Sequence, residues 1–245
     1  MTIWVLLAAL IIGAAVGLLG SGGSILTVPV LLHMLKLPEK VAIAASLGVV
    51  GQISLIALIP YLLRKRVPLD LLKRFVAPAL AGTVSGTWLS GYLSADWQLL
   101  VLAALMLLSA LNMWQQKLWQ WPISSGWALA AVAFTLGGLT GLVGVGGGFL
   151  IVPLLLTVTS LPLVSAVACS LALICLQSWL AFAGHSYLLQ QQGIHLPWSS
   201  IFWLGGLGAV GSLAGVLLSE HLPQQLLKRV FAVVLLLLAG SLFFV

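Results

Sequence analysis

The sequence predicts an all-α polytopic membrane protein made of two homologous helical repeats. Composition, the placement of charge and an internal duplication lead to this prediction. Of the 245 residues, 62% are hydrophobic and 6% are charged, whereas a soluble domain has about 25% charged residues. A soluble fold of this length has no interior large enough to hide so much apolar side chain, so the lipid bilayer must be part of the solvent.

The charged residues are separated by long uncharged runs, the longest of which extends from residue 118 to residue 219. A helix needs about 20 apolar residues to cross the hydrocarbon core, so these runs hold several spans joined by short loops. Five of the ten basic residues lie in one loop, at Arg64, Lys65, Arg66, Lys73 and Arg74. The positive-inside rule places such a loop in the cytoplasm. We therefore assign the net charge of +6 to membrane orientation, expect no nucleic-acid partner, and predict a multi-pass protein of the bacterial inner membrane.

A glycine-rich motif occurs twice. Residues 17–32 read GLLGSGGSILTVPVLL and residues 141–156 read GLVGVGGGFLIVPLLL. Aligning residues 17–54 with residues 141–178, at an offset of 124, gives 17 identities in 38 positions without a gap. Matched glycines, prolines and serines do not arise simply because both segments are rich in leucine. The duplication therefore predicts an internal repeat, as in other repeat architectures.

The register of the repeat resumes further along with five additional residues, where Gly82, Gly86 and Ser90 align with Gly211, Gly215 and Ser219. We place the insertion in a polar loop between His185 and Trp198. The matches divide the chain into a first transmembrane repeat, residues 1–120, and a second, residues 121–245, within one membrane domain.

Each half is expected to hold five helical pieces. The second piece of each half is about a dozen residues long, which is too short to span a bilayer. It directly follows a glycine cluster, so we predict a glycine-broken or re-entrant helix pair in each half. The expected pieces are 3–19, 24–35, 40–63, 70–92 and 96–115 in the first half, and 125–142, 148–158, 163–186, 198–219 and 224–245 in the second.

The charge bias changes sides between the halves. The counterpart of the basic loop, residues 185–197, has no Lys or Arg, and the counterpart of the turn at residues 93–96 leads into Lys228 and Arg229. This exchange is typical of inverted-repeat transporters. Lys36 and Lys40 would then lie outside, which opposes the inverted reading, so a parallel arrangement stays open as the alternative.

The two glycine clusters are the first candidates for a binding site. Each glycine costs about 1 kcal/mol in a helix interior, so helix stability does not explain them. A glycine break followed by a short helix presents free backbone N–H groups that bind anions. The alternative is close helix packing, which we favour for the glycines of the second matched motif. The candidates are Gly20, Ser21, Gly22, Gly23 and Ser24 in the first half and Gly144, Gly146, Gly147 and Gly148 in the second.

Polar residues in the third piece of each half are the second candidates, namely Ser46 and Gln52 in the first half and Ser170 and Gln177 in the second. Their hydroxyl and amide groups would donate to an oxyanion, since no Lys or Arg lies in mid-span. The alternatives are a serine bonded to its own helix and a glutamine bonded to a neighbouring helix. Ser54 and Ser178 lie two turns further on, on the same helix faces.

The remaining histidines, cysteines and acidic residues give no indication of a catalytic or metal-binding site. His33 and His185 lie near predicted helix ends, where we interpret them as interfacial surface residues, with proton coupling as the alternative. The two cysteines, Cys169 and Cys175, lie on different helix faces, so no local disulfide is expected. All four acidic residues lie at span ends or in loops. We therefore predict no catalytic residue, no metal site, no cofactor and no enzyme.

The two glycine motifs, each followed by a Ser-Leu pair at Ser46 and Ser170, resemble the sulfite exporter TauE/SafE family, also called the TSUP family. The resemblance covers both halves of the chain. It implies a bacterial membrane transporter of sulfite, thiosulfate or organosulfonates, driven by an ion gradient, with the glycine motifs and the following serines forming the substrate site. Val145 replaces Ser21 and Gly148 replaces Ser24 in the second motif, so the two halves of that site are chemically unequal.

We therefore expect a secondary transporter, working as an exporter by alternating access, for a small anion such as sulfite, thiosulfate or sulfoacetate. Its expected partners are the lipid bilayer, the anion and a coupling ion, H+ among the candidates, and a homo-oligomer is compatible with the sequence. A passive anion channel and a structural or anchor subunit are the alternatives. A bulky side chain at Gly22 or Gly146 should abolish transport while the protein still reaches the membrane, whereas an anchor subunit would tolerate it.

Overall fold

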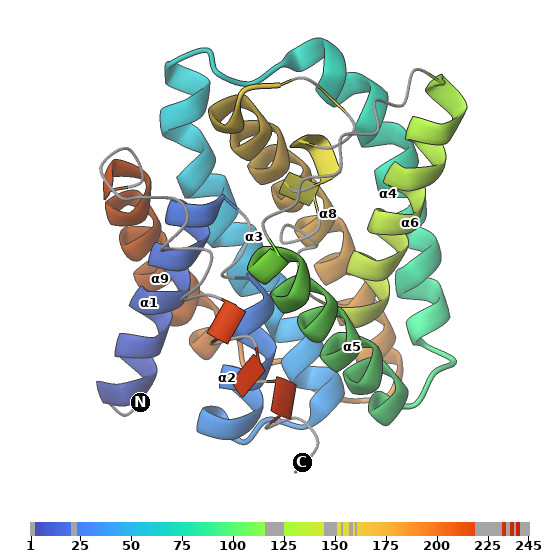
Figure 1. Ribbon diagram of the computed structural model, residues 1–245. Helices are drawn as coiled ribbons and strands as arrows, with labels where there is room; N and C mark the ends of the chain where they lie inside the picture. The colour runs from blue at the N-terminus through green and yellow to red at the C-terminus, as the bar shows by residue number, and fades with distance from the viewer. Residues whose placement is uncertain are drawn as a thin grey trace.

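The protein is a bundle of α-helices, shown by the computed structural model in Figure 1. All regular secondary structure in the described residues is helical, which confirms the predicted fold class. The helices are α1 (Ile3–Leu19), α2 (Ser24–Leu35), α3 (Glu39–Leu63), α4 (Leu69–Ser90), α5 (Ala95–Gln115), α6 (Gly126–Val143), α8 (Leu163–Gln191) and α9 (Trp198–Leu218). The structure describes residues 3–20, 24–115, 125–144, 151–152, 154–156, 159, 161–218, 232–233, 236–237 and 239–240.

Helix lengths agree with a membrane protein. Within the described part of the chain, α3, α6, α8 and α9 are long and apolar enough to cross a bilayer. In contrast, α2 has 12 residues, or roughly 18 Å at 1.5 Å per residue, and cannot cross the hydrocarbon core. The predicted pieces at 148–158 and 224–245 lie mostly outside the described residues.

One predicted boundary is wrong. Helix α8 continues to Gln191, whereas we expected it to end at residue 186 and a polar loop to begin at His185. Leu189 is buried and so gives the extra turn an apolar contact surface, and glutamine is a good helix former. The helix ends just before Gly193, whose φ is +70°. Most of the additional residues of the second half therefore lengthen a helix.

The first glycine of each glycine cluster ends a helix. Gly20 follows α1 with φ +69°, and Gly144 follows α6 with φ +72°. This left-handed region is accessible to glycine at little cost, and it is the usual conformation just past a helix end. The Gly144 N–H bonds the Thr140 carbonyl at 3.1 Å and closes the last turn of α6. The glycine clusters do break their helices, as the sequence predicts.

Two helix pairs are in backbone contact. A Cβ added at Gly13 of α1 would lie 1.8 Å from the Gly208 oxygen of α9, and one at Gly137 of α6 would lie 1.9 Å from the Ala79 oxygen of α4. No side chain fits in such a space, so these glycines permit the crossing. The packing role predicted for the second matched motif is confirmed, because a Cβ would lie 1.9 to 2.3 Å from a carbonyl oxygen of the partner helix at Gly82, Gly86, Gly211 and Gly215.

Corresponding positions make corresponding contacts in the two halves. Gly17 of α1 faces Ser212 and Val216 of α9, and Gly141 of α6 faces Thr83 and Thr87 of α4. The α1 and α6 positions differ by 124 residues and the α4 and α9 positions by 129, as in the sequence alignment.

Helix direction reverses between the halves. The colours of Figure 1 show α1, α3 and α9 running one way and α4, α6 and α8 running the other. At the centre α3 and α8 cross antiparallel, with Gly48 against Phe182 and Gly51 against Trp179. Helices α6, α8 and α9 are therefore opposite in direction to their counterparts α1, α3 and α4. An inverted repeat requires this arrangement, and the repeat itself remains a prediction.

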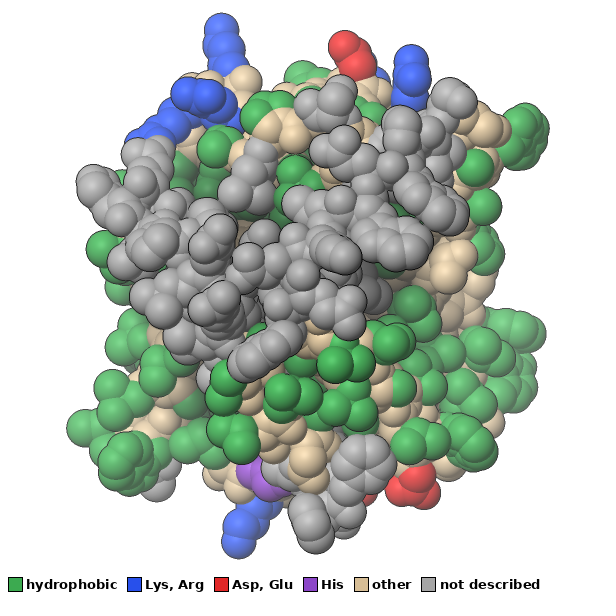
Figure 2. Space-filling model, in the orientation of Figure 1, with side chains coloured by type: hydrophobic (Ala, Val, Ile, Leu, Met, Phe, Trp, Pro, Cys, Tyr) green, Lys and Arg blue, Asp and Glu red, His purple; other side chains and the backbone are tan. Residues whose placement is uncertain are grey.

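Charge distinguishes the two ends of the bundle. On the face drawn in Figure 2, the charged side chains lie at the two ends, and most of the coloured side chains between them are hydrophobic. The end where α3 meets α4 carries five basic residues and Asp70, so its described charges sum to 5 − 1 = +4. The other end carries Lys36 and Lys40 with Glu39 and Asp96, which sum to 2 − 2 = 0. The positive-inside rule therefore places the α3–α4 loop in the cytoplasm.

Candidate substrate path

The glycine motifs lie beside the two central helices. A Cβ added at Gly20 would lie 2.3 Å from Cγ1 of Val167 on α8, and one at Gly144 would lie 2.3 Å from Cγ2 of Ile43 on α3. The end of each half's first helix thus packs against the third helix of the other half. The structure therefore brings the glycine motifs next to the helices that carry the predicted serines and glutamines.

Several predicted site residues lie outside the described part of the chain. They are Ser21, Gly22, Gly23, Gly146, Gly147 and Gly148. Ser24 begins α2, but its side chain is also outside the described atoms. An anion site at the two helix N-termini therefore stays a prediction.

The polar side chains of α3 are bonded to backbone carbonyls. The Ser46 hydroxyl lies 2.7 Å from the Ile43 oxygen and 2.5 Å from the Gly144 oxygen. Gln52 donates through Nε2 to the Gly48 and Ile201 oxygens, at 3.1 and 3.2 Å. Ser54 donates to the Val50 oxygen at 2.7 Å, the local alternative considered for it. These groups hold α3 to α6 and α9, and their donors are occupied.

The polar side chains of α8 differ. Ser170, Gln177 and Ser178 are 0 to 1% exposed. The two hydroxyl oxygens and both amide atoms of Gln177 have no hydrogen-bond partner in the described structure. More than about 90% of buried polar groups in proteins are hydrogen-bonded, and each buried group left unpaired costs about 1–3 kcal/mol. Four such atoms lie within nine residues of α8, which makes these side chains candidates for contact with a ligand.

These residues lie along one side of α8. Ser170 and Gln177 are seven residues apart, close to two full turns, which separates them by roughly 10 Å along the axis. Ser178 adjoins Gln177. A small anion cannot touch both ends of this line at once, so these residues are candidates for successive contacts along a path. Thr27 of α2 is a further buried hydroxyl without a partner in the described structure.

His185 corrects a prediction from the sequence. We expected an interfacial surface residue, but its side chain is 6% exposed and its Nε2 lies 2.7 Å from the Gly141 oxygen of α6. The expected helix end at residue 186 concealed its burial, and the Leu188–Leu189 pair was the available signal for a longer helix. His33 does lie exposed near a helix end, as expected. Cys169 and Cys175 are buried free thiols, in agreement with the predicted absence of a disulfide between them.

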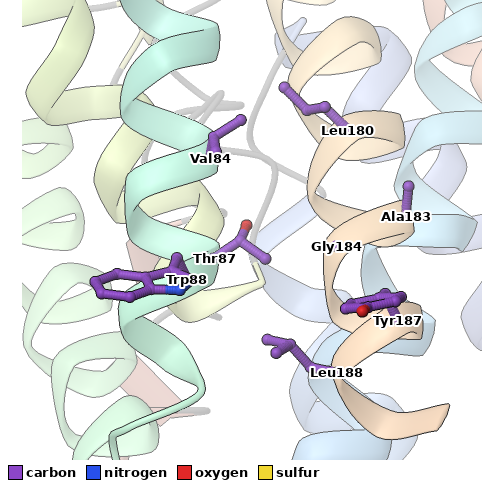
Figure 3. Close-up of a pocket in the computed structure, with 8 residues that line it drawn as sticks. All are labelled: Val84, Thr87, Trp88, Leu180, Ala183, Gly184, Tyr187 and Leu188. Atoms are coloured by element: carbon purple, nitrogen blue, oxygen red, sulfur yellow. The ribbon is translucent and has the colours of Figure 1, made fainter. Parts of the chain in front are cut away.

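A cavity of about 400 Å³ lies between α4 and α8. Figure 3 shows Val84, Thr87 and Trp88 on its α4 side and Tyr187 and Leu188 among the α8 residues opposite. Its lining contains no charged side chain, and the Thr87 hydroxyl is directed to the Gly141 oxygen at 3.4 Å. A hydrocarbon chain suits this groove better than an anion does. We therefore do not assign the substrate path to it.

Comparison with known proteins agrees with this architecture. The family model described as sulfite exporter TauE/SafE matches residues 5–242. Two relatives from Xylella fastidiosa, in strains Temecula1 and 9a5c, are each named "probable membrane transporter protein". They are 28% identical over 242 and 244 residues, which cover 94% of this chain and 90% of each relative. No solved structure matches significantly. This multi-pass protein of the bacterial inner membrane is therefore a membrane transporter, and it belongs to the sulfite exporter TauE/SafE family.

Proposed function

We propose that the protein is a secondary transporter that exports a small sulfur oxyanion or organosulfonate, such as sulfite, thiosulfate or sulfoacetate. It would work by alternating access between two inverted repeats, residues 1–120 and 121–245. The name of the matching family supports this class of substrate. The reversed helix directions and the matched contacts of α1 with α9 and of α6 with α4 support the inverted repeat, a common plan of such transporters.

The unpaired polar atoms of α8 are the observation that carries the proposal. Ser170 and Ser178 each offer one hydroxyl donor, and the Gln177 amide offers two N–H donors. An oxyanion is an acceptor at every oxygen, so it complements these groups. Its passage would supply the acceptor that the two hydroxyls and the Gln177 N–H groups lack in the described structure.

The absence of fixed positive charge along the path fits a transported ion. Among the described residues of α3, α6, α8 and α9, no Lys or Arg lies in mid-span. Binding at a transport site must be strong enough for entry and weak enough for release. Neutral hydroxyl and amide donors meet this requirement without a permanent ion pair to break at each cycle.

Two rival functions are weaker on the same observations. A passive pore would keep the path open to water, whereas Ser170, Gln177 and Ser178 are 0 to 1% exposed. An anchor subunit without transport has no use for several costly unpaired groups within one helix.

The experiment is transport by purified protein in proteoliposomes. The vesicles would be challenged with sulfite, thiosulfate, sulfoacetate, taurine, sulfate, chloride and nitrate, with charge movement recorded on a solid-supported membrane and labelled-anion counterflow measured in parallel. We expect saturable transport of a sulfur oxyanion or sulfonate, accelerated by the same anion on the other side. Saturation without accelerated counterflow would indicate a pore. No movement of any of these anions in either assay would overturn the proposed function.

A further inference from the structure

We propose that His185 is the site at which this transporter binds its coupling proton, from the end of the molecule opposite the basic loop. The inference rests on the proposed function, because it assigns the coupling ion of that same transport cycle. It is drawn from the position of His185, from its hydrogen bond, and from an unpaired acceptor in the cavity beside it.

The hydrogen bond of His185 fixes its tautomer. The Gly141 carbonyl oxygen, 2.7 Å from Nε2, can only accept. Nε2 therefore carries a hydrogen, and in the neutral ring Nδ1 has the free lone pair. A proton taken up from water forms an N–H bond at Nδ1, and the imidazolium then has two donors. The second donor requires an acceptor that the neutral ring does not need.

Gln98 of α5 supplies such an acceptor. Its Nε2 donates to the Ser90 oxygen at 2.8 Å, which fixes the orientation of the amide, because a carbonyl cannot donate. Its Oε1 is buried and has no partner in the described structure, while the side chain is 2% exposed. Gln98 and His185 line the same small polar cavity. The cavity is thus lined by an unpaired hydrogen-bond acceptor, Gln98 Oε1, and by the imidazole of His185, the one buried imidazole among the described residues.

The cavity has room for the link between them. Its volume is about 20 Å³, enough for one water molecule, which would join the Nδ1–H donor to Gln98 Oε1. Lys40 is the one charged side chain among the residues that line it; α4 contributes Ser90 and Gly91, and α8 contributes Gln192. From α6, His185 meets the uncharged Gly141. Lys40 opposes a second positive charge nearby, and an anion close to His185 offsets that repulsion.

His185 lies where α8 meets α6 of its own half and α4 of the other half. Its bond to Gly141 fastens α8 to α6 next to Thr87 of α4. The position 124 residues earlier carries Tyr61, whose side-chain type ionises near pH 10 and not near neutrality. The imidazole of His185 therefore has no counterpart at the matched position of the first half.

The first test is whether His185 binds a proton. Protein labelled with 15N-histidine would be placed in lipid nanodiscs and its imidazole signals followed from pH 5 to pH 8. The signal missing from His185→Gln belongs to His185. We expect that signal to titrate in the wild type and to titrate at a different pH in Gln98→Leu, which removes the acceptor. A His185 signal that does not change over this range would overturn the proposal.

The second test is coupling. In proteoliposomes given the seven compounds named above, an imposed pH gradient should drive accumulation of the transported anion by the wild type. In His185→Gln this accumulation should be lost while anion counterflow persists, and counterflow also shows that the variant is folded. His33→Gln is the matched control, because His33 is exposed at the same end and bonds the Pro29 oxygen of its own helix at 3.0 Å. Gradient-driven accumulation by His185→Gln would overturn the inference and leave the transporter standing. Absence of wild-type transport would overturn the proposed function, and the NMR titration would still decide whether His185 binds a proton.

Discussion

The two central helices, α3 and α8, occupy corresponding places and yet use their polar side chains differently. In each, 78% of the most apolar stretch is buried, and each is contacted by the glycine that ends the first helix of the other half. On α3, Ser46, Gln52 and Ser54 donate to backbone carbonyls. On α8, Ser170, Gln177 and Ser178 have no partner in the described structure.

The comparison teaches that a matched residue does not guarantee a matched role. Ser46 and Ser170 align at the offset of 124. Ser46 reaches the oxygen of Gly144, but Ser170 makes no corresponding bond to Gly20. A hydroxyl that is bonded to the backbone stabilises the helix packing, and one that is unpaired remains available to a ligand. We therefore propose that α3 is the scaffold of the pair and that α8 is the helix along which the anion moves.

The largest expected effect is on transport by Gln177→Leu. A hydrogen bond to a charged group contributes about 1.5–3 kcal/mol, so losing it should reduce transport of the anion at low concentration by about 10- to 100-fold. Gln52→Leu, the same change on α3, should leave transport within about twofold, because its donors already serve backbone carbonyls. Initial uptake rates in proteoliposomes measure both. Equal losses in the two variants would contradict the division between scaffold and path.

Accessibility to a thiol reagent sharpens the comparison. In a background with Cys169 and Cys175 replaced by alanine, Ser170→Cys should react with a charged, membrane-impermeant thiosulfonate during transport, and the transported anion should slow the reaction. Ser46→Cys should react several-fold more slowly, since its position is closed by the Gly144 contact. Mass spectrometry gives the extent of labelling. Faster labelling at residue 46 than at residue 170 would reverse the assignment.

A third prediction concerns the two helix pairs that flank α3 and α8, namely α1 with α9 and α6 with α4. Gly13→Ala and Gly137→Ala should each lower the free energy of unfolding by about 1–3 kcal/mol, because a Cβ at either position meets a carbonyl oxygen of the facing helix. Gly138→Ala is the control, since the nearest atom to its Cβ is 3.7 Å away. Thermal unfolding in nanodiscs measures the three. If Gly137→Ala alone left the stability unchanged, the packing of α6 against α4 would be looser than that of α1 against α9. The unpaired polar groups of α8 would then result from loose packing in the second half.

The smallest expected effect is on stability at the matched serines. Ser46→Ala should lower the free energy of unfolding by about 0.6 kcal/mol, the average for a side-chain hydrogen bond within a membrane protein. Ser170→Ala removes an unpaired buried hydroxyl, so stability should stay the same or rise. Unfolding measured under the same conditions compares the pair. A loss at Ser170 as large as that at Ser46 would mean that the Ser170 hydroxyl has a structural partner.

Much of the architecture could be predicted from local patterns. The ends of α1 and α6 follow from Gly20 and Gly144, because the conformation past a helix end depends on the residue itself. The close crossings at Gly82 and Gly211 follow from small residues one turn apart. The end of α8 was misplaced, because whether a helix continues past His185 depends on Leu189 finding a buried surface, and that surface belongs to other helices.

The sequence alone determined that this chain is a multi-pass membrane protein, that it belongs to a transporter family, and that serines and glutamines occur within its spans. These properties depend on composition, on charge spacing and on motifs, which are local. The tertiary structure decided which of those polar groups are available. Ser46 is bonded and Ser170 is unpaired because the Gly144 carbonyl accepts from one and no carbonyl in the described structure accepts from the other. His185 is buried because α6 brings the Gly141 oxygen to it across 44 residues of chain, a distance in sequence that no local pattern records.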